Sequence, residues 1–346
     1  MNGSPARWRS PAGLATIADA TARIPLRLWG FGESIGVEAL LAVAGAHARA
    51  IEDRLQRWAE RSTLVGDPLA HVAPGVPLLT ALSRRGSPAL LSRVRELAEM
   101  LATAEVGRSR ARIHRPDLPG WSTEVWVDCM HLDGPFLARY GAMMGDLAWS
   151  DLASELLLSH ARVLQDDRVG LLSHGFDDLG TRPNRVFWGR GQGWALLGLV
   201  DTLAALPDDH SARTEIAQRA RALIGALARY EDAPGRWHTV VDHGKSYVEA
   251  SISAFAALGV QRAIRAGVVS RSHADLVRRA LEAAVECISD SGGLSGVSLA
   301  TPVGATADHY ARVPLTDGGE TSVTWGQGPL LLALLECSPP SVQGAS

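Results

Sequence analysis

Apolar residues recur along this chain at intervals of three and four positions, the spacing that places side chains on one face of an α-helix. Leu90, Val94, Leu97 and Leu101 form one such stripe, and similar stripes occur later in the chain. The pattern predicts about ten helices, or about twelve on a finer division, over residues 35–60, 74–84, 88–106, 127–144, 148–165, 190–206, 211–230, 247–267, 272–289 and 323–337.

Strand signals are few and short, and they include Val240–Val241. Strands and helices do not alternate, which argues against a doubly wound parallel sheet. Helices of similar length joined by alternately short and long loops favour an all-α toroid of inner and outer helices, with a cleft built by the long loops. A stack of helical repeats is the alternative, but the sequence shows no fixed period that would support it.

The chain of 346 residues is long enough to bury a large hydrophobic core without disulfides or metals. No linker-like stretch divides it, so we expect a single domain over residues 1–346. Its ends, at about residues 1–10 and 338–346, have the composition of flexible segments.

Charge and cysteine usage exclude several classes of protein. The net charge of −3 provides no basic field for nucleic acid. Three cysteines far apart in the sequence exclude a disulfide scaffold or a cysteine-rich zinc module. No apolar run approaches the roughly 20 residues of a membrane helix, and the first residues lack the pattern of a signal peptide. We therefore expect no nucleic acid partner, no membrane and a cytoplasmic location.

The motifs of common cofactors are also incomplete. His243–Ser246 ends like a P-loop, but Thr239 stands where that motif needs its first glycine. Gly189–Trp194 has the spacing of a dinucleotide-binding turn, but a bulky tryptophan ends it and no βαβ unit surrounds it. Eleven histidines are scattered without metal-ligand spacing. No motif therefore argues for a metal or an organic cofactor, and the sequence makes no prediction of the oligomeric state.

Tryptophan is unusually frequent, with 10 residues against 5 phenylalanines and 4 tyrosines. Indole rings are flat, amphipathic platforms on which sugar rings stack. Trp188, Arg190 and Trp194 lie within seven residues, in a glycine-rich segment that opens a helix. Two aromatic faces and one guanidinium suit a sugar that carries a carboxylate. Alternatively, the glycines only permit close helix packing and the tryptophans fill the core.

Asp128 is a candidate acid catalyst. It begins an otherwise apolar helix and lies two residues after Trp126, where desolvation favours a carboxyl that keeps a proton to donate. The alternative is a carboxylate that only stabilises the N-terminus of the helix through the helix dipole.

Six segments, through their order and spacing together, resemble the unsaturated rhamnogalacturonyl hydrolases and the related unsaturated glucuronyl hydrolases. The resemblance covers the chain from about Trp29 to Glu336. The segments are WVDCM (126–130), SHGFD (173–177), WGRGQGWAL (188–196), GRWHTVVD (235–242), SYVEASISAF (246–255) and WGQGPLLLALLE (325–336).

This resemblance implies an (α/α)6 barrel and a glycoside hydrolase without metal or organic cofactor. It carries over five site residues: Asp128 as the catalytic aspartate, His174 as a histidine of the cleft, Arg190 and Trp194 as the substrate-binding pair of an R-G-x-x-W motif, and Trp188 as a further aromatic contact.

Two further segments bear on the site. We interpret Glu249 and Ser251 as structural residues that hold an inner helix in place. The family has a second cleft carboxylate upstream of the catalytic one, and Asp67 or His71 is the candidate for its place. No acid aligns there unambiguously, so this position leaves the substrate open.

The substrate that the resemblance implies is a short lyase-derived oligosaccharide with a 4,5-unsaturated uronic acid at its non-reducing end. The rhamnogalacturonyl type is favoured over the glucuronyl type. The reaction implied is hydration of the vinyl ether of that ring, with Asp128 as general acid and then base. A sugar epimerase on the same barrel would instead use histidine pairs, such as His174 with His238 or His243. A carbohydrate-binding protein without catalysis is the third hypothesis.

Overall fold

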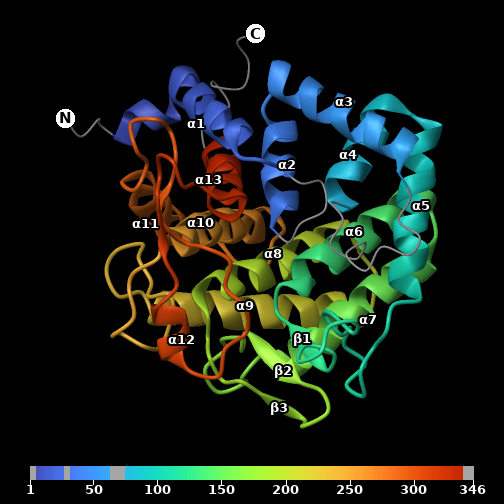
Figure 1. The fold of residues 1–346 in the computed structure, drawn as a ribbon. Coiled ribbons are helices and arrows are strands. Elements are labelled where there is room, and N and C mark those ends of the chain that lie inside the picture. Colours follow the sequence, from blue (N-terminus) through green and yellow to red (C-terminus); the bar gives the residue numbers. More distant parts are fainter. Residues whose placement is uncertain (1–4, 27–31, 63–74, 338–346) are drawn as a thin grey trace.

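The computed structural model describes residues 5–26, 32–62 and 75–337 of the chain. Thirteen α-helices lie in these ranges (Figure 1). Six of them form an inner ring, in which each helix packs against the next and the last packs against the first. They are α2 (Glu33–Ala42), α4 (Gly75–Arg85), α6 (Cys129–Met144), α8 (Gly189–Ala205), α10 (Ala250–Arg265) and α13 (Thr324–Cys337).

Six outer helices cover this ring. Each contacts the inner helix before it and the inner helix after it in the chain, and α1 contacts both α13 and α2. The closed arrangement confirms the predicted (α/α)6 barrel and excludes an open stack of helical repeats. The outer helices are α1 (Pro11–Arg23), α3 (Ala46–Arg61), α5 (Pro88–Ala102), α7 (Leu147–Leu164), α9 (Arg213–Arg229) and α11 (Ala274–Val285).

The distribution of apolar residues explains which helices lie inside. Every residue of α8 from Gly189 to Leu203 is buried, as expected for a helix that is predominantly apolar around its circumference. In α3, by contrast, only Ala48, Ile51, Leu55 and Ala59 are buried. These positions form one face of the helix, so the charged residues between them meet solvent.

Several helices differ from the sequence-based expectation, and the short α12 (Ala307–Ala311) is among those not predicted. The predicted helix over residues 35–60 is in fact α2 and α3, because the chain turns at Gly45, whose φ of 92° suits glycine. The prediction also lacks α1. This helix begins with Pro11 at its first position, and the hydroxyl of Ser10 caps it by accepting from the amide of Gly13.

The segment at about residues 1–10 that we expect to be flexible contains a short helix in its second half. Residues Pro5–Arg9 form the 3-10 helix η1, which packs against α1 and α11. Trp8 within it is buried, so the segment contributes to the core. Residues 1–4 and the predicted flexible end at 338–346 fall outside the described ranges.

Short strands lie in the long loops at one end of the barrel. The strands β1 (Glu124–Trp126), β2 (Gly175–Asp177) and β3 (Arg182–Pro183) form one antiparallel sheet, and β4 (Ser295–Ser298) pairs with β5 (Leu315–Asp317). The short helices η3 (Arg271–His273) and α12 (Ala307–Ala311) complete the described elements. No helix in these ranges is long and apolar enough to span a lipid bilayer.

The predicted strand at Val240–Val241 is wrong. Val240 forms only an isolated bridge with Trp188. The amide of Val241 donates to the carbonyl of Phe187, and the amide of Gly189 donates to that of Thr239. This short backbone pairing attaches the loop before α10 to the start of α8.

Candidate active site

The first residues of the inner helices meet in the loops that carry the strands. Asp128, Trp188 and Glu249 are the N-cap residues of α6, α8 and α10. β1 leads directly into Asp128, and its antiparallel partner β2 follows His174. The amide of Val127 donates to the carbonyl of His174 at 3.0 Å. Strand pairing therefore brings Asp128 beside His174, although the two are distant in sequence.

Asp128 and His174 form a buried pair. Their side chains are 1% and 0% exposed, and Oδ2 of Asp128 lies 3.2 Å from Nε2 of His174. The two atoms are close but not aligned, and neither has a hydrogen-bond partner among the described residues. Asp128 makes no side-chain cap to α6, so no hydrogen bond supports the alternative of a simple helix cap.

Aromatic rings enclose His174. The ring of Trp188 lies 4.3 Å from the imidazole, that of Tyr310 5.5 Å and that of Trp126 5.6 Å, between centroids. Trp126 is held in turn because its Nε1 donates to Glu124 at 2.7 Å. Burial raises the pKa of the Glu124 carboxyl, against the effect of that hydrogen bond. The imidazole is therefore fixed by packing on several sides.

Arg190 is buried, and its guanidinium binds inside the protein. Nη1 donates to Oε1 of Glu249 at 2.5 Å and to Oγ of Ser298 at 2.6 Å. Nη2 donates to the carbonyl of Leu299 and to Oγ1 of Thr301, both at 3.0 Å. Burial lowers the pKa of Arg190, and the charge of Glu249 opposes this. Arg190 thus holds the segment after β4 in place, and a direct grip on a substrate carboxylate stays a prediction.

Glu249 joins the elements around Arg190. Its Oε1 also accepts from the hydroxyls of Ser251 at 2.6 Å and Ser298 at 2.9 Å, and its Oε2 accepts from Thr239 at 2.7 Å. These hydrogen bonds tie the start of α10 to α8, to β4 and to the turn at Thr239. They agree with the structural role expected for Glu249 and Ser251.

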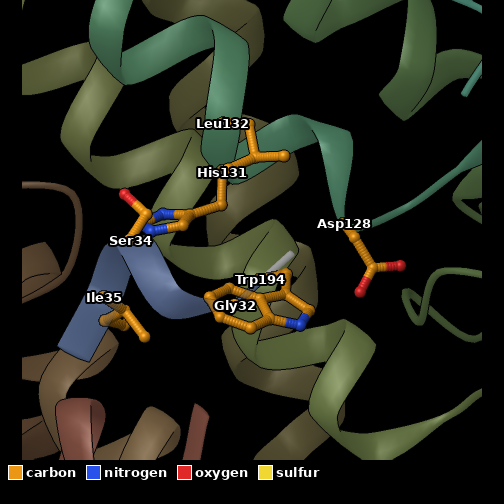
Figure 2. A pocket seen from close by; sticks show the side chains of 7 residues that line it. All are labelled: Gly32, Ser34, Ile35, Asp128, His131, Leu132 and Trp194. Carbon is orange, nitrogen blue, oxygen red and sulfur yellow. The ribbon is translucent and has the colours of Figure 1, made fainter. Parts of the chain in front are cut away.

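A narrow pocket, too tight in this conformation to hold a water molecule, lies beside Asp128. Figure 2 shows the indole of Trp194 between Asp128 on one side and Ser34 and His131 on the other. Burial lowers the pKa of His131, which favours the neutral imidazole. Sequence reasoning missed His131, and the available signal was its place one helical turn after Asp128.

The segment from Trp188 to Trp194 also packs the core. A Cβ added at Gly193 would lie 2.5 Å from Cβ of Phe255, so only glycine lets α8 approach α10 this closely. Trp188 and Trp194 are themselves buried. These positions therefore have the packing role of the alternative, and their contact with substrate stays a prediction. Both rings nevertheless border the site, because Trp188 contacts His174 and Trp194 lines the pocket.

Three buried polar atoms around His174 have no hydrogen-bond partner in the described part of the chain. They are Oδ2 of Asp128, Nε2 of His174 and Nε1 of Trp188. Oδ2 of Asp128 and Nε2 of His174 face each other at 3.2 Å, so a small rotation pairs them. Buried polar groups in native proteins are nearly always satisfied, which leaves Nε1 of Trp188 as the buried donor of this group that still needs a partner.

Several residues at the site come from segments that sequence reasoning did not connect with it. Tyr310 of α12 reaches His174, and Ser298 and Thr301 bind Arg190. These three residues lie outside the six segments and more than 100 positions from the residues that they contact. Trp325, which opens the last of those segments, has its ring 5.7 Å from the Arg190 guanidinium.

The alternative acid–base histidines are bound elsewhere. Nδ1 of His238 contacts the carbonyl of Ser246 at 2.5 Å, and its Nε2 lies 3.4 Å from Asp232. His243 lines a separate pocket with Asn184 and Asp242. The geometry therefore gives no support to a His174 pair of the epimerase kind.

Two expectations, on a second cleft group and on a metal site, depend on which residues the structure describes. Asp67 and His71, the candidates for a second cleft group, lie outside the described residues. Within residues 5–26, 32–62 and 75–337, no group of three or more His, Cys, Asp or Glu side chains is arranged to hold a metal ion.

Sequence comparison finds a family match over most of the chain. Residues 24–339 match the family described as Glycosyl Hydrolase Family 88. One curated relative is the unsaturated rhamnogalacturonyl hydrolase YesR of Bacillus subtilis, 29% identical over 214 residues. The alignment covers 62% of this chain and 59% of that protein, so the chain matches about three fifths of the relative's length.

Solved structures share the barrel over nearly the whole chain. A possible member of the GH105 family from Salmonella enterica has a TM-score of 0.82 at 24% identity, covering 94% of this chain and 93% of its own. The unsaturated glucuronyl hydrolase of Bacillus sp. GL1 has a TM-score of 0.69 at 16% identity, covering 97% and 98%. At these identities the likeness shows the fold.

Proposed function

The chain belongs to glycosyl hydrolase family 88, and from this premise we propose that it removes a 4,5-unsaturated uronic acid from the non-reducing end of a lyase-derived oligosaccharide. The unsaturated rhamnogalacturonyl type is the favoured substrate and the glucuronyl type is the second choice. The observation that carries the proposal is the buried Asp128–His174 pair, which lies beside a pocket in a chain of this family.

The geometry of the site supports an acidic sugar as the ligand. The N-terminal ends of α6, α8 and α10 meet there, and each contributes the positive end of its helix dipole. The rings of Trp188 and Trp194 border the site. An anionic sugar therefore finds positive potential, aromatic side chains and the Asp128 carboxyl in one place.

The proposed reaction is hydration of the vinyl ether, with Asp128 as the proton carrier. Asp128 gives its proton to C4 of the sugar, and positive charge develops at C5 and the ring oxygen. The oxygen of a water molecule adds to C5, and the proton that this water loses returns to the Asp128 carboxylate. The resulting hemiketal opens to a ketone at C5, and C1 then releases the remaining sugar as an alcohol.

Arg190 and His174 have a more indirect part in this proposal than the sequence suggested. The guanidinium of Arg190 is bound to Glu249 and the segment after β4, and His174 has no exposed surface. We assign Arg190 to shaping the cleft and His174 to holding Asp128. A cytoplasmic location belongs to the same proposal and is tested by fractionation of the source cells.

The ultraviolet absorbance of the substrate provides the test. The conjugated ene-carboxylate absorbs, and hydration destroys this chromophore. Purified protein is mixed with unsaturated rhamnogalacturonan and unsaturated glucuronyl disaccharides in separate reactions. Asp128→Asn is the test variant, and Asp290→Asn, at a side chain that is 88% exposed, is the matched control.

We expect wild type and Asp290→Asn to remove the chromophore equally and Asp128→Asn to lose at least about a hundredfold in rate, as is typical for loss of a general acid. The relative rates on the two disaccharides then identify the sugar. Turnover retained by Asp128→Asn would overturn the catalytic assignment. Tight binding of a disaccharide without loss of absorbance would favour the non-catalytic hypothesis.

A further inference from the structure

The hydroxyl of Tyr310 lies at the centre of a buried hydrogen-bond network. Tyr310 is fully buried on α12. Its Oη accepts from the amide of Gly304 at 3.0 Å and from Nδ2 of Asn184 at 3.3 Å. The backbone amide can only donate, so the direction of the first bond is certain. The direction of the second depends on how the Asn184 amide is oriented.

Backbone groups fix that orientation. Oδ1 of Asn184 accepts from the amides of Val186 at 3.2 Å and Gly175 at 3.4 Å. Nδ2 also donates to the carbonyl of Gly304 at 2.9 Å. A flipped side-chain amide would place a donor against two amide donors and an acceptor against a carbonyl. Nδ2 is therefore the atom that faces Tyr310.

These contacts leave Tyr310 one way to use its own proton. With both acceptor positions of the hydroxyl occupied, its O–H donates to Nδ1 of His174 at 2.7 Å. Burial raises the pKa of Tyr310 well above its usual range, so the proton stays on the phenol. Nδ1 of a neutral His174 is then unprotonated, and the imidazole proton is on Nε2.

The Nε2–H faces the acid. Nε2 lies 3.2 Å from Oδ2 of Asp128, and the rings of Trp126, Trp188 and Tyr310 prevent the imidazole from turning away. The two atoms are not aligned for a full hydrogen bond, and catalytic hydrogen bonds are often poorly aligned until substrate binds. A small rotation of Asp128 completes it.

We propose that Tyr310 is a positioning residue that fixes His174 as the Nε2–H tautomer and so supplies a hydrogen-bond donor to Asp128. This role rests on the proposed function for its catalytic meaning. The donor holds Oδ2, which leaves Oδ1 to give and take the proton, and it stabilises the carboxylate formed when the proton has passed to C4. Asn184 contributes by directing the Tyr310 hydroxyl toward His174.

The tautomer is measured directly by NMR of protein labelled with ¹⁵N-histidine, because protonated and unprotonated imidazole nitrogens have clearly different shifts. His174→Gln identifies the His174 signals by their loss. We expect an unprotonated Nδ1 and a protonated Nε2 in wild type. A protonated Nδ1 would overturn the proposal, and this measurement requires neither substrate nor a Tyr310 variant.

Kinetics of Tyr310→Phe provide the second test. We expect kcat to fall about 10- to 100-fold while KM stays within about threefold, and the Nε2–H form to lose its dominance. Tyr140→Phe removes a hydroxyl from another buried tyrosine, which packs against Phe136 and Trp149, and should leave both readouts at the wild-type values. An unchanged kcat in Tyr310→Phe would refute the positioning role.

The two proposals can fail separately. If wild type leaves every unsaturated disaccharide intact, the proposed function fails, and the NMR measurement still decides which nitrogen of His174 is protonated. If turnover occurs but Nδ1 carries the proton, only the role of Tyr310 fails.

Discussion

Glu249→Gln removes the charge that balances Arg190 while keeping the size and shape of the side chain. Glu249 is fully buried and accepts from Arg190 at 2.5 Å, as well as from Thr239, Ser251 and Ser298. The amide can turn its NH2 toward Thr239 and keep an oxygen toward Arg190. The buried guanidinium then loses its nearest countercharge, which is the main energetic effect of the substitution.

The expected loss of stability follows from the burial of both groups. Removing one partner of a buried ion pair lowers the free energy of unfolding by about 3–5 kcal/mol. The unfolding entropy of a chain this long is about 0.7 kcal/mol/K, so Tm should fall by about 4–7 °C. Differential scanning fluorimetry measures the shift, and urea denaturation measures the free energy of unfolding.

A matched substitution at an exposed pair separates burial from charge loss. Arg110 and Glu155 are paired with side chains that are 70% and 47% exposed, so Glu155→Gln should cost less than about 1 kcal/mol. A double-mutant cycle of Glu249→Gln with Arg190→Met should give a coupling of about 1–3 kcal/mol. If the Tm of Glu249→Gln lies within about 1 °C of the wild-type Tm, the reasoning about an unbalanced buried charge is refuted.

Two further predictions concern packing and pH. At Gly198 an added Cβ would lie 2.6 Å from the carbonyl carbon of Met130, so Gly198→Ala must push α8 away from α6. We expect the free energy of unfolding to fall by about 1–3 kcal/mol. A urea midpoint equal to that of wild type would contradict this. The hydrogen bond from Arg279 holds the pKa of Glu231 below the ordinary 4.5, so this pair stabilises the fold above that pH and less as pH falls through the lower folded value. Between about pH 5 and about pH 3, the Tm of Glu231→Gln should therefore fall less than the Tm of wild type. Equal falls in Tm would argue against the linkage.

The sequence predicted most helices because their apolar stripes are local. It missed α1 because its buried face consists largely of the small residues Gly13, Ala18, Ala20 and Thr21, which barely raise the apolar pattern. It merged α2 and α3 because a single turn at Gly45 interrupts neither stripe. The strands are so short that alternation cannot be recognised in them.

The candidate site was predictable where the motifs are compact and not where topology brings distant segments together. Asp128 and the segment from Trp188 to Trp194 are marked by local chemistry. Tyr310 is 136 positions from His174, and Ser298 is 108 positions from Arg190. The folded loops alone create these contacts. The binding partners of Arg190, and so its indirect role, could not be read from the chain.

The closure of the inner ring affects how the protein unfolds. A linear array of helical repeats can fray from either end, since its terminal repeats have a single neighbour. Here α13 packs against α2 and α1, so the first and last hairpins each have neighbours on both sides. Neither terminal hairpin can therefore unfold while the ring stays closed. We expect the helices to unfold together, as one cooperative unit.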